Sequence, residues 1–271
     1  MTYKQQIGKV LLTARANATL SKNEVKEKDE QENIYPYRME RGYRVNQAKG
    51  LIALGLFKDY DDIRNSPKQT FGNYMPGDIK YKDVNGDGII DDQDQVAVGA
   101  TTVPNLVYGI GVSAQWKGLD VNVHFQGAGK SSFFIDGEGV RPFASGNRGN
   151  FYQEVIDGRW ISKEESGTIA TENPHAKYPR LSYGYNDNNN RNSSYWLRNG
   201  SYLRLKTLEV GYTLPKKIVN RIHFNNIRIY MIGTNLITWS KFKMWDPEMN
   251  SSNGATYPLA KSVTVGLNVN L

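Results

Sequence analysis

The stretch from Ser262 to Leu271, S-V-T-V-G-L-N-V-N-L, alternates strictly between apolar residues and polar or small ones. Successive side chains of a β-strand point to opposite faces, so this period of two predicts a strand with one apolar and one polar face. The stretch also has the roughly 9–11 residues with which a tilted strand crosses a bilayer. Such a strand is typical of an outer-membrane barrel, although a soluble sandwich can use the same alternation. The apolar set is Val263, Val265, Leu267, Val269 and Leu271.

Five further segments alternate in the same way and predict five more strands. The Lys117-Gly118 dipeptide between two of them predicts a tight hairpin turn. The alternation slips in phase near Thr207, which predicts a β-bulge. The fold class is therefore all-β: about six antiparallel transmembrane strands that form a β-barrel segment. The five segments are residues 10–20, 108–116, 119–126, 202–214 and 227–236.

Short and long connections alternate strictly between these strands. Outer-membrane barrels show this pattern because they have short periplasmic turns and longer extracellular loops. We therefore expect the long segments, residues 21–104, 130–200 and 239–260, to lie outside the cell. The polar run Asn186–Ser194 reads as a turn-rich part of these loops.

On this interpretation the apolar sets of strands 119–126, 227–236 and 262–271 face lipid, and their polar sets line the lumen. Aromatic side chains near the strand ends either form girdles at the two membrane interfaces or pack within loops. These side chains are Tyr108, Trp116, Trp196, Tyr202, Tyr212 and Trp239.

Composition excludes several other classes of protein. The chain has no cysteine, and its three scattered histidines, His124, His175 and His223, lack zinc-ligand spacing. The formal charge of +7 is spread along the chain, which argues against a nucleic-acid partner. No apolar run reaches the length of a membrane helix, and no HExxH, GxSxG or P-loop motif indicates an enzyme.

One stretch carries ligand chemistry. Residues 83–94, D-V-N-G-D-G-I-I-D-D-Q-D, place oxygen donors at the spacing of a calcium loop, with Gly88 at the sharp turn. The flanking residues look extended, so we expect a stand-alone Ca²⁺ loop with a structural role rather than an EF-hand. The alternative is an acidic turn without metal. The candidate metal ligands are Asp83, Asn85, Asp87, Ile89 (through its carbonyl), Asp91 and Asp94.

Several blocks of sequence now identify a resemblance. They are P-G-D-I-K-Y-K-D-V-N-G-D-G-I-I-D-D (76–92), Y-G-I-G-V (108–112), W-K-G-L-D-V-N-V-H-F-Q-G (116–127), Y-P-R-L (178–181), W-L-R-N-G-S-Y-L-R-L-K-T-L-E-V-G-Y-T-L-P (196–215) and Y-P-L-A-K-S-V-T-V-G-L-N-V-N-L (257–271). In content and order they resemble the C-terminal end of SusC/RagA-type TonB-dependent outer-membrane transporters, over nearly the whole chain.

The resemblance implies a barrel of about 22 strands, plugged by an N-terminal domain, that takes up oligosaccharides or peptides with energy from TonB. It implies a SusD-like surface lipoprotein as partner, contact with the TonB complex through an N-terminal part, and contact with outer-membrane lipid. We expect residues 1–271 to be the C-terminal part of such a barrel, without signal peptide or plug, and inactive alone. Leu271 departs from the aromatic residue usual at the end of this family.

Two other readings of the sequence remain open. A secreted, calcium-dependent, glycan-binding β-sandwich would share the alternating strands and the calcium loop. A peripheral interaction module would use only the long loops. Within those loops, aromatic faces could stack on sugar rings or simply pack the loop on itself. The candidate aromatic residues are Trp160, Tyr178, Tyr183 and Tyr185.

Overall fold

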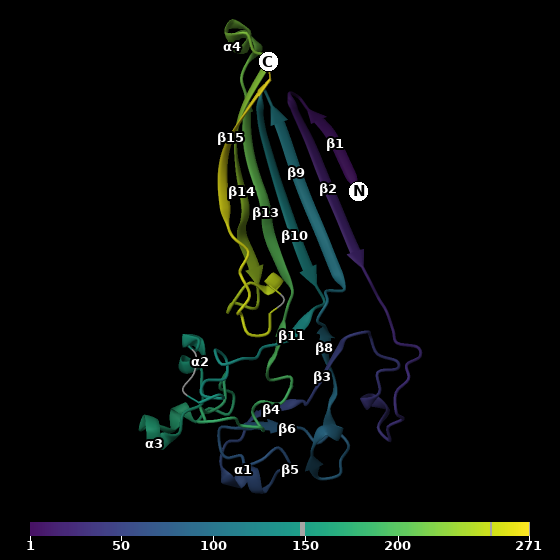
Figure 1. Ribbon diagram of the computed structural model, residues 1–271, viewed down its shortest axis with the longest axis vertical. Coiled ribbons are helices and arrows are strands. Elements are labelled where there is room, and N and C mark those ends of the chain that lie inside the picture. The colour runs from purple at the N-terminus through teal and green to yellow at the C-terminus, as the bar shows by residue number, and fades with distance from the viewer. Residues whose placement is uncertain (147–149, 250, 271) are drawn as a thin grey trace.

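The computed structural model describes residues 1–146, 150–249 and 251–270 and is dominated by one antiparallel sheet of seven strands (Figure 1). The strand order is β1-β2-β9-β10-β13-β14-β15. Each strand of this sheet therefore pairs with the next strand of the same sheet along the chain, and the strands β3–β8, β11 and β12 belong to the long connections between them. The strands are β1 (Thr2–Ile7), β2 (Val10–Leu20), β9 (Leu106–Trp116), β10 (Leu119–Gly129), β13 (Tyr202–Thr213), β14 (Asn226–Ser240) and β15 (Ser262–Asn270).

The register brings the apolar sets of the strands onto one face. Residues directly opposite each other in neighbouring strands share a face of the sheet. If the apolar sets predicted for the individual strands share one face, they must therefore pair with one another across the strands. One row consists of Leu12, Ala114, Val121, Val210, Met231 and Val265. The next row, on the other face, consists of Thr13, Ser113, Asn122, Glu209, Ile232 and Thr264. The predicted sheet with one apolar and one largely polar face is confirmed.

The predicted bulge lies where the phase of β13 slips. The pairing of β13 with β14 shifts between Leu205 and Thr207, and its pairing with β10 shifts opposite this point, between His124 and Phe125. The extra residue restores the apolar side chains beyond the bulge to the same face, because one inserted residue reverses the alternation.

The strand β1 was not among the predicted strands. Its sequence, T-Y-K-Q-Q-I, is too polar to show an apolar period of two, yet it pairs with β2 from Thr2↔Arg15 to Ile7↔Val10. Gly8, with φ of 59°, forms the turn between them, where the left-handed region favours glycine. The sheet therefore has seven strands rather than about six, and Leu271 lies outside the described residues.

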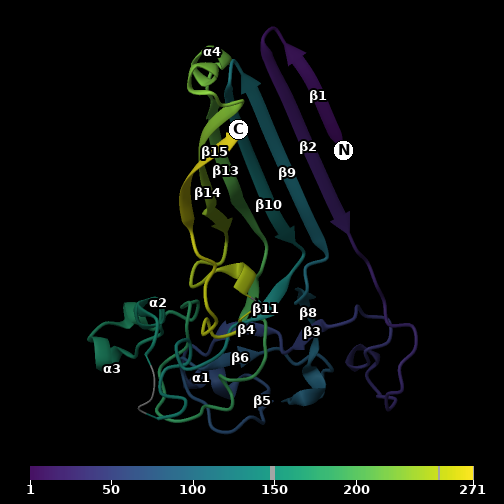
Figure 2. The ribbon, with the colours of Figure 1, turned by 45° about the horizontal axis from the view of Figure 1, so that its top comes forward.

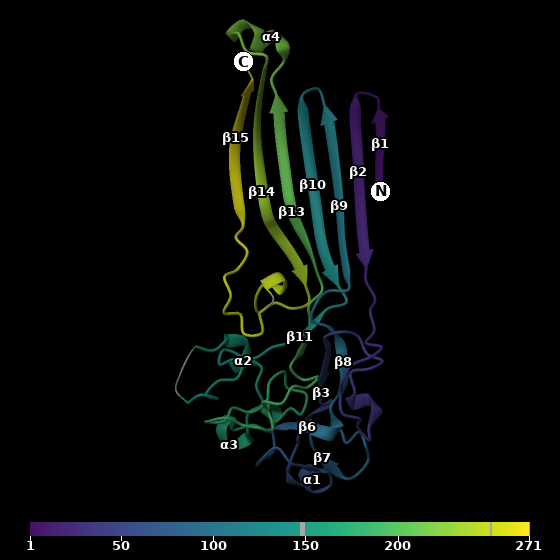
Figure 3. The same cartoon turned by 45° about the vertical axis from the view of Figure 1, so that its right-hand side comes forward.

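The ends of the sheet differ as the connection lengths predict. The turns β1–β2, β9–β10 and β13–β14 lie at one end, and all long connections leave from the other (Figure 3). The β13–β14 turn contains α4 (Lys216–Val219) and η4 (Asn220–Ile222). In the part of the chain that is described, no helix is long and apolar enough to span a membrane.

The long connections pack together into a compact body that we call the cap, formed by the described residues of 21–105, 130–201 and 241–261 (Figure 2). Its elements are η1 (Pro36–Arg38), β3 (Gln47–Gly50), β4 (Ala53–Leu56), α1 (Tyr60–Arg64), β5 (Lys68–Gln69), β6 (Ile79–Tyr81), β7 (Ile89–Ile90), η2 (Asp92–Asp94), β8 (Val96–Thr101), β11 (Ser132–Phe134), α2 (Gln153–Asp157), α3 (Lys163–Ser166), η3 (Ile169–Thr171), β12 (Leu197–Asn199) and η5 (Pro247–Met249).

The buried hydrophobic cluster of the protein lies in this cap, not on the sheet. It is built from all three long connections, with side chains that are almost wholly inaccessible to solvent. The outer, apolar face of the sheet is uncovered by contrast, and Val265 is 72% exposed. The cluster is Leu51, Leu56, Phe71, Ile79, Tyr81, Ile90, Ile135, Val140, Val155, Trp160, Tyr178, Trp196 and Phe242.

The aromatic side chains near strand ends divide into two groups. Four lie on the apolar face near a strand end, where a girdle stays the prediction; they are Tyr108, Trp116, Tyr212 and Trp239. Trp196 is not a girdle residue, because it is only 1% exposed inside the cap core. Tyr202 is buried too and pairs with Ser240 and Ala128 on the polar face of the sheet.

Candidate functional site

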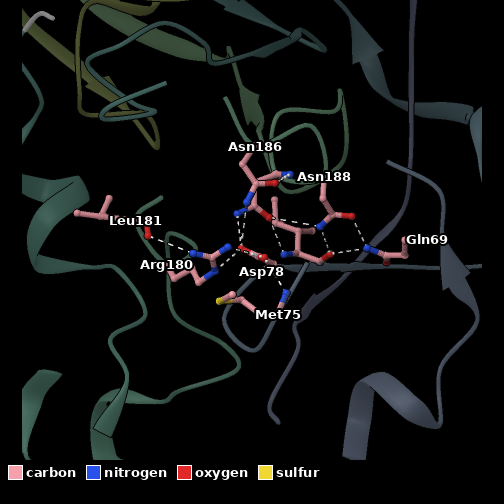
Figure 4. Close-up of polar contacts among 9 residues, drawn as sticks. Gln69, Met75, Asp78, Arg180, Leu181, Asn186 and Asn188 are labelled. Carbon is pink, nitrogen blue, oxygen red and sulfur yellow. Dashed lines mark hydrogen bonds and ion pairs between the residues drawn. The ribbon is translucent and has the colours of Figure 1, made fainter. Parts of the chain in front are cut away.

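The centre of the cap is a buried carboxylate. Asp78, which is inaccessible to solvent, precedes β6 and forms an ion pair with Arg180, with Oδ1 2.9 Å from Nε and Oδ2 3.0 Å from Nη2 (Figure 4). Its Oδ2 also accepts from the backbone N–H of Met75 at 2.9 Å. A buried charge is tolerated only when it is paired and hydrogen-bonded. Asp78 therefore joins the first and second long connections at one point.

The polar run 186–190 supplies most of the remaining partners. Asn189 Nδ2 donates to Asp78 Oδ1 at 2.7 Å, and Asn186 Nδ2 donates to the same oxygen at 3.3 Å. Asn188 and Asn189 are buried, and their amides bond the backbone C=O and N–H of Ile79 at 2.9 Å each. The middle of this turn-rich run is therefore buried, although its composition is typical of a loop. Its amides satisfy backbone groups of β6 that burial would otherwise leave unpaired.

A second pair of side chains extends this network. Gln69 Oε1 accepts from the backbone N–H of Tyr81 at 2.7 Å, and Gln69 Nε2 donates to Ile79 O at 3.0 Å. Tyr81 Oη donates to the backbone carbonyl of Asn188 at 2.6 Å. Burial raises the pKa of the Tyr81 phenol, so it stays a neutral donor at physiological pH. The network therefore joins residues 69–81 of the first long connection to residues 180–189 of the second.

The four candidate sugar-stacking aromatics do not form one site. Trp160 is 6% exposed and Tyr178 is 1% exposed, so both belong to the core, and their stacking role is corrected. The alternative interpretation, that these aromatics pack the loop on itself, holds for these two residues. Tyr183 and Tyr185 are 76% and 64% exposed and stay available to a ligand.

Gly77 provides the space for Trp160 beside the buried carboxylate. It has a φ of 85°, and a Cβ at this position would lie 2.4 Å from Trp160 Cε3. We expect Gly77→Ala to lower the stability of the cap by about 1–3 kcal/mol more than Gly86→Ala does. Gly86 is a matched control because its φ is 78° and no atom lies near its would-be Cβ. Limited proteolysis of the cap measures the difference, and equal cleavage rates would contradict the packing argument.

The predicted calcium loop is a hydrogen-bonded turn in this structure. Asp83 Oδ1 accepts from Gly86 N at 2.6 Å and its Oδ2 from Gly88 N at 2.9 Å. Asn85 Nδ2 donates to Asp87 Oδ2 at 2.9 Å. The flanks are extended as expected, since β6 precedes the loop and β8 follows it.

Asp94 closes this loop from its far end. Its carboxylate is buried and accepts from Val84 N at 2.7 Å and from Asp91 N at 2.9 Å, while Ile89 pairs with Lys68 in a short parallel bridge. Among the described residues, no group of three or more His, Cys, Asp or Glu side chains is placed to hold a metal ion. The hydrogen-bonded turn describes this arrangement, and the calcium site stays a prediction.

The polar face of the sheet carries charged side chains that the alternation alone did not single out. Arg228 of β14 reaches across the strand between them to Asp120 of β10, with Nε 3.0 Å from Oδ1, and to Glu209 of β13 at 2.7 Å. It crosses at Gly211, where a Cβ would lie 2.3 Å from Arg228 Nη2. The sequence places Asp120, Glu209 and Arg228 in three different strands, and only the register shows that they meet.

Nearer the cap, the same face carries a second charged cluster. Arg204 of β13 is 1% exposed, and its guanidinium lies 2.6 Å from Asp246 and 3.3 Å from Glu248. Both carboxylates belong to the connection between β14 and β15, so that connection folds over the polar face of the sheet. The sequence placed this segment among the outer loops but did not show which face it covers.

The sheet and its loops define the class of protein: an antiparallel segment of a transmembrane β-barrel with long loops gathered at one rim. No family model matches the chain. It is 31% identical over 242 residues to TonB-dependent receptor P26 of Formosa agariphila, over 84% of this chain and 23% of the receptor. It is 26% identical over 241 residues to TonB-dependent receptor P3 of the same organism, over 80% of this chain and 22% of the receptor.

A solved structure of the RagAB peptide importer in its "open-open" state has the same fold. It superimposes with a TM-score of 0.68 at 19% identity, over 100% of this chain and 28% of that chain. These relatives confirm the resemblance to TonB-dependent outer-membrane transporters. They are receptors and transporters of the outer membrane rather than enzymes, and this chain spans about a quarter of their length.

Proposed function

We propose that this chain forms part of the barrel wall and the extracellular cap of a TonB-dependent transporter that imports an oligosaccharide or peptide nutrient. The observation that carries the proposal is the two-faced sheet with a packed cap at one rim only. Lipid would contact the apolar face, and the polar face would line the path of the cargo. The tight turns would lie in the periplasm.

The edges of the sheet imply further strands. Within a bilayer, the free backbone groups of edge strands such as β1 and β15 have no water to bond, so a spanning sheet must close into a barrel. In this proposal the sheet is completed to a barrel of about 22 strands, the size class of plugged outer-membrane transporters. A plug would contact TonB, and a SusD-like lipoprotein would meet the cap.

The rival β-sandwich gains no support from the sheet. A sandwich buries the apolar face of each sheet against a second sheet about 10 Å away. Here Val263, Val265 and Leu267 are 63–72% exposed, and within the described residues the remaining sheets have only two strands each and lie in the cap.

The test is nutrient uptake by the source cell. Deleting the gene should abolish uptake of at least one labelled oligosaccharide or peptide, and dissipating the proton-motive force should do the same in wild-type cells. An antibody against residues 130–200 should detect a band well above 30.6 kDa in the outer-membrane fraction. A soluble band of 30.6 kDa, with uptake unchanged by the deletion, would overturn the proposal.

A structural calcium ion in the loop 83–94 is part of the proposal, and it rests on the sequence pattern. Calcium should raise the melting temperature of the intact receptor, because a ligand that binds only the folded state stabilises it. Asp87→Ala should remove this shift, since it deletes a donor and leaves the closing carboxylate of Asp94 in place. If calorimetric titration with CaCl₂ gives the same binding heat for the wild-type receptor and the Asp87→Ala variant, the loop is a metal-free turn.

A further inference from the structure

A cavity of about 680 Å³ lies where the polar face of the sheet meets the cap. Three aromatic rings line it: Phe133 and Phe134 of β11, and Tyr202 at the start of β13. Four serine and threonine residues also line it: Thr102, Ser131, Ser251 and Ser252. Because Tyr202 faces the polar side of the sheet, the cavity lies on the lumenal side in the proposed transporter, at the entrance to the barrel.

The charges on this cavity have one sign. Asp136 and Glu248 line it, and none of the described lining residues is basic, although the chain as a whole has a formal charge of +7. Asp136 is offset by Arg141, whose Nη1 lies 3.0 Å from its carboxylate. Of the two acidic residues that line the cavity, Glu248 is therefore the one that can give it a net negative charge.

Among the described residues, Glu248 shares its one ion-paired cation, Arg204, with another carboxylate. Arg204 lies 2.6 Å from Asp246 and 3.3 Å from Glu248, so one guanidinium faces two acids and the three groups sum to −1. Glu248 Oε2 is buried and lies 3.3 Å from Arg204 Nε, whereas the Glu248 side chain as a whole is 28% exposed. A carboxylate that shares one guanidinium with a second acid keeps an excess of negative charge, which favours the approach of another cation.

We propose that this cavity binds the cationic group of a peptide cargo, a lysine or arginine side chain or a free amino terminus, in preference to a neutral glycan. The Glu248 carboxylate pairs with the cation, and the ring of Phe133 contacts its alkyl stem and offers cation–π attraction. The ring of Tyr202 already carries the Arg204 guanidinium, 5.5 Å from its centre. The inference rests on the proposed transport function and chooses between the two cargo classes that it leaves open.

The test compares two synthetic peptides on the intact receptor purified in detergent. Both are blocked at their termini and carry one central lysine, which is acetylated in the second peptide. We expect the lysine peptide to bind about tenfold more tightly, as befits one hydrogen-bonded charge pair, and to lose this advantage at high salt. Equal affinity of the wild-type receptor for both peptides would overturn the inference.

Two variants locate the effect within the cavity. Glu248→Gln keeps the shape and removes the charge, and Ser252→Lys adds a cation from an exposed lining position whose backbone carbonyl, not its side chain, bonds Asp136 N. Both should abolish the preference for unmodified lysine. Glu164→Gln, an exposed carboxylate of α3 outside the cavity, should leave the preference unchanged. A preference that survives in both lining variants would place the cation elsewhere and overturn the assignment.

Uptake by cells separates this inference from the proposed function. If the receptor imports a neutral oligosaccharide and shows no preference between the peptides, the cation site is wrong and the transport function stands. If gene deletion changes the uptake of neither peptide nor oligosaccharide, the transport function itself is wrong.

Discussion

Replacing Asp78 with alanine is expected to destabilise the cap by about 3–5 kcal/mol, the range for removing one partner of a buried ion pair. The change would leave the Arg180 guanidinium without its carboxylate in a site where Asp78 is inaccessible to solvent. It would also remove the acceptor for the Met75 N–H and the Asn189 amide. Unsatisfied buried donors add their own desolvation cost.

Hydrogen exchange of the intact receptor measures this effect locally. Peptides that cover residues 69–81 and 180–196 should exchange faster in the variant, because the network joins these two segments. The matched control is Asp61→Ala, which removes an ion pair with Arg64 whose side chains are 75% and 68% exposed. Exposed pairs contribute less than about 1 kcal/mol. Equal exchange in the two variants would show that the buried network does not hold the cap together.

The sheet could be predicted from sequence because its rules are local. The alternation of apolar and polar residues within each strand shows which side chains share a face. Even the β-bulge near Thr207 is visible in the sequence, because it shifts the phase of this alternation. The strand Thr2–Ile7 was missed for the same reason: its polar composition leaves no period to detect, and only the pairing with Val10–Leu20 establishes it.

The cap could not be predicted in this way, because its contacts join residues far apart in the chain. Asp78 and Asn189 are separated by 111 positions, and neither carries a local sign that it is buried. Asparagine is usual in turns, so the run 186–190 predicts a turn-rich loop but does not show that its side chains are buried. Its burial depends on unpaired backbone groups of β6 that exist only once the two connections meet.

The calcium loop shows a different limit. Its spacing of oxygen donors is a local pattern, and so is a chain of turns in which aspartate side chains accept backbone N–H groups. The same residues, Asp83 and Asp94, serve either arrangement, and the amide-bonded one is observed. A pattern that two chemistries share can be separated only by a binding measurement.

Val123→Arg is expected to lower the free energy of unfolding from a bilayer by about 2–4 kcal/mol, the cost of arginine on the lipid face near the midplane. Val123 lies mid-strand in β10 and pairs with Val112 and Leu208 on the apolar face. Its neighbour Asn122 pairs with Ser113 and Glu209 on the polar face, so Asn122→Arg should cost less than about 1 kcal/mol. Urea titration of the receptor in liposomes gives both values.

Depth along the strand makes this test specific for a membrane. Leu119 shares the apolar face with Val123 but lies at the turn end of β10, opposite Trp116 and Tyr212. In a bilayer, arginine near the interface costs only about 0–1 kcal/mol, so Leu119→Arg should be far milder than Val123→Arg. In a water-soluble sheet the cost would follow packing instead of depth. A cost at Asn122 equal to that at Val123 would reverse the assignment of faces, and equal costs at Leu119 and Val123 would remove the case for lipid around this sheet.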